Sequence, residues 1–386
     1  MTVFKDIIPI AKKIIGKYYL CDFCLGRLFS KKLNLSSEKI LGKKLKKEIR
    51  ISQKKCYICK DLFENIPTYL EKMKEVSNEY HFSSFVVGTK IQPSIVDRDD
   101  SIRSRFQIRG ADGIKTGITR EISKEFSKKT KKKMEFLDPE VTFTIDLKEQ
   151  TCKIRSKNLI FQGRYIKNQR GLPQKQKSCE NCNGKGCGLC KFHGISNYES
   201  IEGKISDVIF KKFGGTVAKF TWIGGEDKSS LVLGSGRPFF TRLQNPKKRK
   251  SKFPKILQNQ PVKIHNLKII SDIPKLPLNF TSLIQILIST DHELSSSHLN
   301  KLHSLSATPI IISENSGKKS EKQIYDVSYK KKSKNQFILR IKADGGLSVK
   351  RFVLGENVVP SVSQLLDTDC KCVEFDFLDI QMITNN

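Results

Sequence analysis

The cysteines constrain the fold of this chain more than any other feature. Eight of the eleven cysteines fall into four C-x2-C pairs, which are Cys21 with Cys24, Cys56 with Cys59, Cys179 with Cys182, and Cys187 with Cys190. A tight turn lets both thiolates of such a pair face one ion, and two pairs complete the tetrahedral four-sulfur site that structural zinc prefers. The sequence therefore predicts one or two structural Zn²⁺ ions around which the chain folds.

The two sets differ in spacing. Cys179 to Cys190 form one compact motif, CENCNGKGCGLC, whose glycines allow the backbone to wrap closely around an ion. Disulfides or an iron–sulfur cluster are the alternatives for this motif, and thiol redox chemistry is the alternative for the wider set. Neither set has an open position or a neighbouring acid, so we interpret both as structural. Of the remaining cysteines, we expect Cys152 to be buried in a strand and assign no role to Cys370 and Cys372.

Charge is the second constraint. The chain has 71 Lys and Arg against 39 Asp and Glu, a formal net charge of +32. A surface this basic repels itself unless it has a polyanionic partner. The basic residues are spread along the chain, with runs at 43–47, 128–133, 247–252 and 330–334. We predict a nucleic acid as the partner, with a solvated surface or an anionic membrane surface as the alternative.

Several classes of protein are disfavoured. No apolar run approaches the roughly 20 residues of a membrane span, and the N-terminal segment MTVFKDIIPIAKK lacks the apolar region of a signal peptide. We therefore expect a cytoplasmic protein without a membrane partner. The sequence contains no phosphate-binding glycine motif and no HExxH, so we expect no nucleotide cofactor. Nothing in it requires more than a monomer.

The patterning predicts an α+β, multidomain chain. Residues 1–66 are expected to form a small helical module stapled by zinc. Three-four spacing of apolar residues predicts helices over 114–126 and 201–213, the second ended by Gly214 and Gly215. Alternation predicts strands over 141–147, 151–154, 158–161, 217–223, 231–233, 239–243, 262–270, 283–288 and 337–341. Residues 245–255, NPKKRKSKFPK, are expected to be a mobile basic loop.

One loop could carry acid chemistry. In WIGGEDKSSLVLGSGRPF, residues 222–239, glycines frame Glu226 and Asp227 between two predicted strands. An acid on a glycine-flanked loop at a strand end is a candidate nucleophile or base. The alternative is an ordinary turn.

Four further motifs connect the chain to a known family. These are CDFCLGRLF at 21–29, RSRFQIRGADGIKTGITREI at 103–122, FQGRYIKNQRGLPQ at 161–174, and the compact cysteine motif followed by YESIEGKI. Together, and in this order over nearly the whole chain, they resemble the archaeal and eukaryotic tRNA pseudouridine synthases that carry a THUMP domain. The resemblance implies a THUMP-type RNA-binding domain over 67–171, a linker with a zinc knuckle over 172–196, and a pseudouridine synthase fold with a central, mainly antiparallel sheet over 197–386.

The same resemblance implies an activity and its residues. Family members isomerise uridines 54 and 55 in the T-loop of tRNA, without a cofactor for catalysis. Their signature is G-R-E-D-V-D-V-R followed by L-G-x-G-R-P-F, against which Asp227 corresponds to the catalytic aspartate and Arg237 to the second motif's arginine. Lys350, in GGLSVKRF, corresponds to the lysine of a G-x-Y-I-K-E element near the active site. Lys350 and Arg237 are therefore implied to bind the substrate RNA.

The chain also departs from that signature. The arginine before the acid pair is Gly225, the second acid is Ser229, the second arginine is Leu231, and the tyrosine of the lysine element is Ser348. A further tyrosine, expected near the start of the 283–288 strand, is absent, with Ile284 as its replacement, and the family's R-V-x-H-R-R stretch is not recognisable after Pro309. These losses keep a second interpretation open, a tRNA-binding protein with weak or no catalysis on the same scaffold. A ribosome-associated factor is a third.

Overall fold

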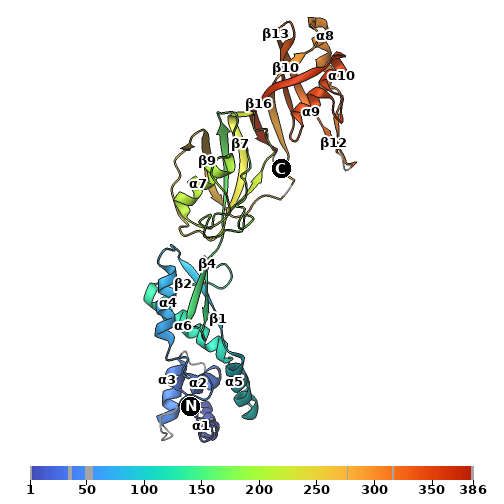
Figure 1. Ribbon diagram of the computed structural model, residues 1–386. Helices are drawn as coiled ribbons and strands as arrows, with labels where there is room; N and C mark the ends of the chain where they lie inside the picture. The colour runs from blue at the N-terminus through green and yellow to red at the C-terminus, as the bar shows by residue number, and fades with distance from the viewer. Residues whose placement is uncertain (1, 34–36, 48–54, 276, 315–316, 384–386) are drawn as a thin grey trace. The chain divides into compact units, whose positions relative to one another are not determined.

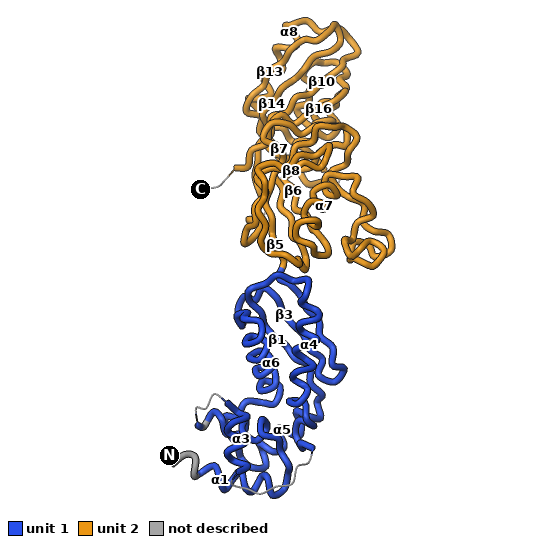
Figure 2. The backbone as a smooth tube through the Cα atoms, turned by 90° about the vertical axis from the view of Figure 1, so that its left-hand side faces the viewer, with its two compact units in different colours: residues 1–157 blue, residues 158–386 orange. Residues whose placement is uncertain are grey.

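The structure is a computed structural model, which describes residues 2–33, 37–47, 55–275, 277–314 and 317–383. The chain divides into two compact units, Met1–Lys157 and Asn158–Asn386 (Figure 2). Both units combine helices and strands, which confirms the mixed α and β content expected from the sequence. Among the described residues, no helix has the length and apolar character needed to cross a membrane.

The first unit combines helices with a small sheet (Figure 1). Its helices are α1 (Thr2–Ile15), α2 (Asp22–Phe29), η1 (Lys31–Leu33), α3 (Glu38–Lys47), α4 (Ile66–Ser77), α5 (Pro93–Arg105) and α6 (Ile114–Thr130). Its strands are β1 (Ser84–Lys90), β2 (Lys133–Met134), β3 (Val141–Asp146) and β4 (Thr151–Ser156), in the order β2-β1-β3-β4. β1 pairs in parallel with β2 and β3, and β3 pairs antiparallel with β4.

The predicted helix and strand of this unit form as their patterns indicate. The apolar positions of β3 are buried while its threonines are partly exposed, as expected for a half-buried strand. Phe126 of α6 packs edge-on against Phe85 of β1 and Phe143 of β3. One hydrophobic core runs from Ile7 to Leu147. The predicted N-terminal module of residues 1–66 therefore shares its core with the segment that follows it.

The second unit is built on a nine-stranded sheet in the order β13-β14-β10-β16-β7-β5-β9-β8, with β6 paired to β7. Its strands are β5 (Leu159–Lys167), β6 (Ala218–Trp222), β7 (Leu231–Leu243), β8 (Ile256–Asn259), β9 (Val262–Ile270), β10 (Phe280–Thr290), β13 (Ile324–Ser333), β14 (Gln336–Asp344) and β16 (Cys370–Met382). The pair β16–β7 is parallel and the other pairs are antiparallel, in agreement with the expected mainly antiparallel sheet.

The remaining elements of this unit are not part of this sheet. They are α7 (Ile201–Phe213), α8 (Ser296–Asn300), η2 (Lys301–Ser306), α9 (Val349–Leu354), α10 (Val362–Leu366) and the short strands β11 (Ile310–Ser313), β12 (Lys319–Lys322) and β15 (Val358–Val359), which form a separate sheet. The basic segment 245–255 forms no helix or strand. It is anchored, however, because Phe253 packs against Phe161 and Phe213 and the Lys252 carbonyl accepts a hydrogen bond from Lys212. The expected mobile loop is thus tied down at its end.

The structure draws the boundary between the units earlier than the predicted one at residue 171. β5 lies between β7 and β9 and pairs with both, so it is an inner strand of the second unit's sheet. Its residues are buried almost throughout, since both edges of the strand and one face are covered. The sequence pattern predicted a strand at this point but could not indicate which sheet it would join.

Candidate active site

The acidic loop predicted from the sequence connects β6 to β7. Gly224 precedes the two acids and adopts a φ of +74°. A Cβ atom at this position would lie 2.5 Å from the Phe280 ring and 2.8 Å from the Arg237 guanidinium, so only glycine fits. The loop therefore approaches the start of β10 closely, and the sequence motif reflects this contact.

Asp227 and Lys350 meet in the structure although they are 123 residues apart in the chain. Lys350, at the start of α9, donates a hydrogen bond of 2.7 Å to Oδ2 of Asp227. Ser229 donates to Oδ1 through its backbone N–H, at 2.9 Å, and through its hydroxyl, at 2.7 Å. The Lys350 ammonium, followed by the Ser229 amide, lowers the pKa of Asp227 to about 2. The carboxylate is thus ionised at neutral pH, and its side chain is 32% exposed.

Glu226, the other acid of the loop, has a different environment. Its side chain is fully buried. Oε2 accepts hydrogen bonds from the Tyr165 hydroxyl at 2.7 Å and from Nε of Arg237 at 3.3 Å, and Oε1 lies 3.4 Å from the Lys167 ammonium. Burial raises the pKa of Tyr165 well above its ordinary value, so its hydroxyl remains a donor. Glu226 therefore belongs to a buried ionic network beneath the loop and is closed to a substrate.

The buried Lys167 holds the loop's backbone. Its ammonium donates hydrogen bonds to the carbonyls of Leu172 at 2.9 Å, Asp227 at 3.1 Å and Lys228 at 3.3 Å. Burial lowers the pKa of Lys167, an effect that the charge of Glu226 opposes. The cation thus fixes the main chain at the residue that carries the candidate nucleophile.

Arg170 binds the loop at Ser229, next to the residues that Lys167 contacts. Its guanidinium makes a bidentate ion pair with Asp376 of β16, at 2.7 and 2.8 Å, and donates to the Ser229 carbonyl at 2.6 Å. Asp376 in turn accepts the backbone N–H of Leu231 at 2.9 Å. The loop's own arginines are absent at Gly225 and Leu231, but two other cations bind it instead: Lys167, the last residue of β5, and Arg170, which follows shortly after it. Sequence reasoning assigned no role to either, although both lie in the FQGRYIKNQRGLPQ motif.

Arg237 lies inside the protein. Its side chain is 1% exposed, its Nη1 donates to the Ile223 carbonyl at 2.9 Å, and its guanidinium lies 4.3 Å from the centre of the Phe377 ring. Arg237, which was predicted to bind RNA, thus binds the loop from inside the protein, through Glu226 and the Ile223 carbonyl. One face of it nevertheless reaches the pocket described next.

A pocket of about 220 Å³ opens beside the loop. Gly224, Gly225 and Arg237 line one side, Phe280, Ser282, Ile284 and Phe377 contribute from β10 and β16, and Asp344, Gly346 and Leu347 lie before α9. The volume is below the 300–1,000 Å³ of pockets for larger ligands and suits a single ring. Phe280 supplies an aromatic ring near the position where a tyrosine was expected. It was missed because the strand was predicted to begin at 283.

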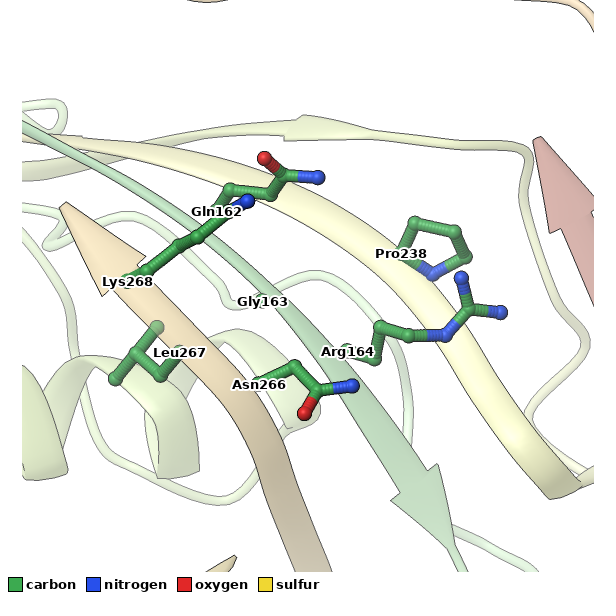
Figure 3. A pocket seen from close by; sticks show the side chains of 7 residues that line it. All are labelled: Gln162, Gly163, Arg164, Pro238, Asn266, Leu267 and Lys268. Carbon is green, nitrogen blue, oxygen red and sulfur yellow. The ribbon is translucent and has the colours of Figure 1, made fainter. Parts of the chain in front are cut away.

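A second hollow lies over β5, β7 and β9 and has about 460 Å³ (Figure 3). Arg164 is its most basic feature, but the guanidinium is already bound to the Ser235 carbonyl and hydroxyl and to the carbonyls of Gly236 and Ile380. The other side chains around it are those of Gln162, Pro238, Asn266, Leu267 and Lys268, with no acid or nucleophile. The acidic loop is therefore the better candidate for chemistry.

The eight paired cysteines gather into two groups of four, as predicted. Within each group the sulfur atoms lie within 4.8 Å of one another. Cys21 and Cys59 are 3.6 Å apart, and Cys190 is 3.8 Å from both Cys182 and Cys187. Zn–S bonds of about 2.3 Å in a tetrahedron separate the sulfurs by roughly 3.8 Å, whereas a disulfide requires about 2.05 Å. Both groups therefore fit a metal ion better than disulfides.

Donors around the sulfurs support this fit. In the second group, the Cys190 amide and then the Asn181 side chain lower the pKa of Cys187 to about 6, which favours the thiolate that zinc requires. In the first group, burial raises the pKa of Cys24, so a thiolate there needs a nearby positive charge. Two four-cysteine groups thus could hold structural zinc. Cys152 and Cys372 are half-buried and Cys370 is buried, and none of the three joins a group.

Comparison with known proteins shows which family this architecture resembles. Residues 160–381 match the family description "Pus10, C-terminal", and residues 69–146 match "Pus10 THUMP domain, archaeal". A protein of Nitrosopumilus maritimus strain SCM1, named tRNA pseudouridine synthase Pus10, is 55% identical over 99% of this chain and 100% of its own. A protein of Cenarchaeum symbiosum strain A with the same name is 34% identical over 94% of this chain and 90% of its own.

The matches first define a class, that of proteins joining a THUMP domain to a Pus10-type C-terminal domain. The chain belongs to the Pus10 family. Among solved structures, the archaeal box H/ACA sRNP Nop10-Cbf5 complex matches over 56% of each chain with 8% identity and a TM-score of 0.27, too weak a likeness to carry an argument.

Proposed function

We propose that this chain is a tRNA pseudouridine synthase, an isomerase acting on uridine 54, uridine 55 or both in the T-loop, with Asp227 as its nucleophile. The single observation that carries the proposal is the ionised, partly exposed Asp227, which Lys350 holds in a loop whose Gly224 and Gly225 line a ring-sized pocket. Membership of the Pus10 family and the names of the relatives support the same activity.

The reaction requires three changes in the substrate. The N1–C1′ bond of uridine breaks, the uracil turns, and a C5–C1′ bond forms, after which C5 loses its proton and N1 carries one. Atoms and electrons balance within the nucleoside, so no co-reactant is consumed. In this scheme Asp227 either bonds to C1′ as N1 leaves and is released again when C5 bonds to C1′, or it assists cleavage without forming a bond. Lys350 keeps its carboxylate ionised. A base then removes the proton from C5.

The pocket would hold the detached uracil. The rings of Phe280 and Phe377 offer apolar surfaces to its faces, and Arg237 lines the pocket together with Gly224 and Gly225. The target uridine must first leave its stack, which costs a few kcal/mol. Contacts between phosphates and the basic protein, at a net charge of +32, offset this cost.

The two cysteine groups are proposed to hold one structural Zn²⁺ each. Cys21, Cys24, Cys56 and Cys59 would bind the first ion and Cys179, Cys182, Cys187 and Cys190 the second. When bound, each ion would supply cross-links in folding and no chemistry, because all four positions are taken by thiolates. The THUMP domain is proposed to bind tRNA by its shape. A cytoplasmic, monomeric protein stays our prediction.

The alternative is a tRNA-binding protein without catalysis, which the departures at Gly225 and Ser348 favour. Release of tritium from a transcript carrying 5-tritiated uridine separates the two. We expect release by the wild-type protein, loss of release in Asp227→Ala, and normal release in the control Asp272→Ala, which removes an exposed carboxylate of the same unit. Salt-sensitive tRNA binding without any tritium release would support the non-catalytic alternative.

A further inference from the structure

A further pocket of the second unit lies between the compact cysteine loop and α7. It has a volume of about 440 Å³ and shares no lining residue with the pocket beside Asp227. The loop contributes Leu189, Lys191 and His193, and α7 contributes Phe210 and Lys211. Neither the proposed reaction nor the zinc ligands account for these five side chains.

An aromatic platform forms one wall of this pocket. The imidazole of His193 stacks on the ring of Phe210, with centroids 3.8 Å apart and planes inclined by 8°. The hydroxyl of Tyr198 lies 2.6 Å from Nδ1 of His193 and fixes the orientation of the imidazole. A ring held in this way between two partners loses little conformational freedom when a further planar group stacks on it.

The rim combines apolar surface with positive charge. Leu189 is 82% exposed, which leaves its side chain uncovered beside the platform. Lys191 and Lys211 are exposed at the same pocket. The one acid among the lining residues, Asp207, pairs with Lys211 at 2.7 Å and also accepts a hydrogen bond from Asn259 at 3.1 Å. The charges of Asp207 and Lys211 therefore offset each other, and Lys191 gives the rim its net positive charge. The rim therefore favours an anionic ligand.

We propose that this pocket is a second nucleotide-binding site, which takes one unpaired nucleotide of the tRNA substrate. The base stacks over the His193 platform with Leu189 at its edge, and the phosphate approaches Lys191. Stacking on an aromatic ring beside cations is the usual way in which proteins bind single nucleotides without reading their sequence. The proposal rests on tRNA being the substrate. It assigns the cysteine loop a role in binding a part of the tRNA other than the uridine in the proposed catalytic pocket.

The test compares variants of the full-length protein on an unmodified tRNA transcript. His193→Ala removes the platform, whereas His193→Phe keeps an aromatic ring without the Tyr198 hydrogen bond. Lys191→Ala removes a charge at the pocket, and its matched control Lys185→Ala removes one from the same loop outside the pocket. The measurements are Kd by filter binding, kcat and KM by tritium release, and zinc content for the integrity of the loop.

We expect His193→Ala to raise Kd and KM on the order of tenfold, the effect of one lost base-stacking contact, with kcat and zinc content unchanged. His193→Phe should stay close to wild type, and Lys191→Ala should weaken binding more than Lys185→Ala. Unchanged Kd and KM in His193→Ala would overturn the proposal. So would an equal loss in His193→Phe, since the hydrogen bond would then matter and not the ring.

The outcome is separable from that of the proposed activity. If the wild-type protein releases no tritium but His193→Ala still weakens tRNA binding, the synthase proposal fails and the nucleotide site stands. If tritium release is normal and none of the pocket variants changes Kd, only the nucleotide site fails, and a protein ligand for this pocket becomes the alternative.

Discussion

At the scale of single residues, the candidate site depends on the different environments of two neighbouring acids. Glu226 is buried in an ionic network, and Asp227 is partly exposed and held ionised by Lys350. The difference follows from the loop's path, since one side chain turns toward Lys167 and Arg237 and the next toward α9. The same short sequence thus provides both a buried structural anion and an accessible one.

Replacing Lys350 should change the pH dependence of the reaction. The pKa of Asp227 is lowered to about 2, with Lys350 as the first cause, so the carboxylate of the wild-type protein stays ionised down to that pH. In Lys350→Met the pKa should return toward about 3.9. We expect the acid limb of kcat/KM to move to higher pH and the plateau to fall roughly tenfold, because a charge-assisted hydrogen bond is lost.

The pH profile of tritium release, recorded from the lowest pH at which the protein stays folded, measures both effects. Lys350→Arg is the control, because it keeps the positive charge and should keep the acid limb where it is. An unmoved profile in Lys350→Met would mean that Asp227 does not depend on this contact.

Lys167 should be essential to the fold of the loop although it touches no substrate. In Lys167→Met, Glu226 loses one of its cations and the carbonyls of Asp227 and Lys228 lose a donor. Removing one member of a buried ionic network costs about 3–5 kcal/mol in the free energy of unfolding. Urea denaturation should show this loss together with a fall in kcat. The exposed Lys219→Met is the control, and equal stability of the two variants would contradict the assigned role.

At the scale of elements, β5 and the segment after it organise the candidate active site. β5 is an inner strand that ends at Lys167, and Arg170 follows it closely. The two cations bind successive carbonyls of the acidic loop, those of Asp227, Lys228 and Ser229. Arg170 reaches Asp376 of β16, so a contact between residues 206 apart in the chain fixes the loop. The site is therefore assembled from both halves of the second unit's sequence.

This placement predicts where the second unit begins as an independent folding unit. A fragment of residues 158–386 should unfold cooperatively in urea, whereas a fragment of residues 172–386 should not, because its sheet lacks an inner strand between β7 and β9. Circular dichroism against urea concentration, with zinc present, compares the two. Cooperative unfolding of both fragments at the same midpoint would contradict the assigned place of β5.

Much of this unit could be predicted from periodicity, and the exceptions have physical reasons. α7 and β9 have clear apolar patterns and form where expected. β7 was predicted as two pieces because Gly234 and Gly236 interrupt its pattern, yet the strand continues through them. A Cβ at Gly234 would lie 2.1 Å from the Leu378 carbonyl, so the glycine allows β16 to approach. β13 was missed because its lysines, at an exposed edge, hide the alternation.

For the site, the resemblance to a family indicated Asp227, Arg237 and Lys350, and all three lie at or beneath one loop. The resemblance did not indicate Lys167, Arg170 or Phe280. Their roles arise from contacts between distant segments, and periodicity carries no information about such contacts. Only the fold brings them together.

At the scale of the whole molecule, two four-cysteine groups and a strong positive charge are its distinguishing features. One group lies in each unit, so each unit has its own cross-linked segment. Metal binding of this kind contributes directly to folding.

The metal content can be predicted. We expect purified protein to contain two zinc ions per chain, and Cys182→Ser to contain one, with the ion of Cys21, Cys24, Cys56 and Cys59 retained. Cys24→Ser should also contain one ion. It should destabilise the first unit more than Cys182→Ser destabilises the second, because Cys24 is buried in the first unit's core. Elemental analysis after dialysis measures the content, and the control is Cys152→Ser. Iron in place of zinc, or no bound metal, would contradict the prediction.

The central claim is that Asp227 isomerises a T-loop uridine, and mapping of pseudouridine in the product tests it most directly. An unmodified tRNA transcript is incubated with the protein, labelled with a carbodiimide that marks pseudouridine, and examined by primer extension. We predict stops caused by pseudouridine at position 54, position 55 or both with the wild-type protein, and none with Asp227→Asn, which keeps the side chain's shape. Pseudouridine formed equally well by Asp227→Asn would contradict the account.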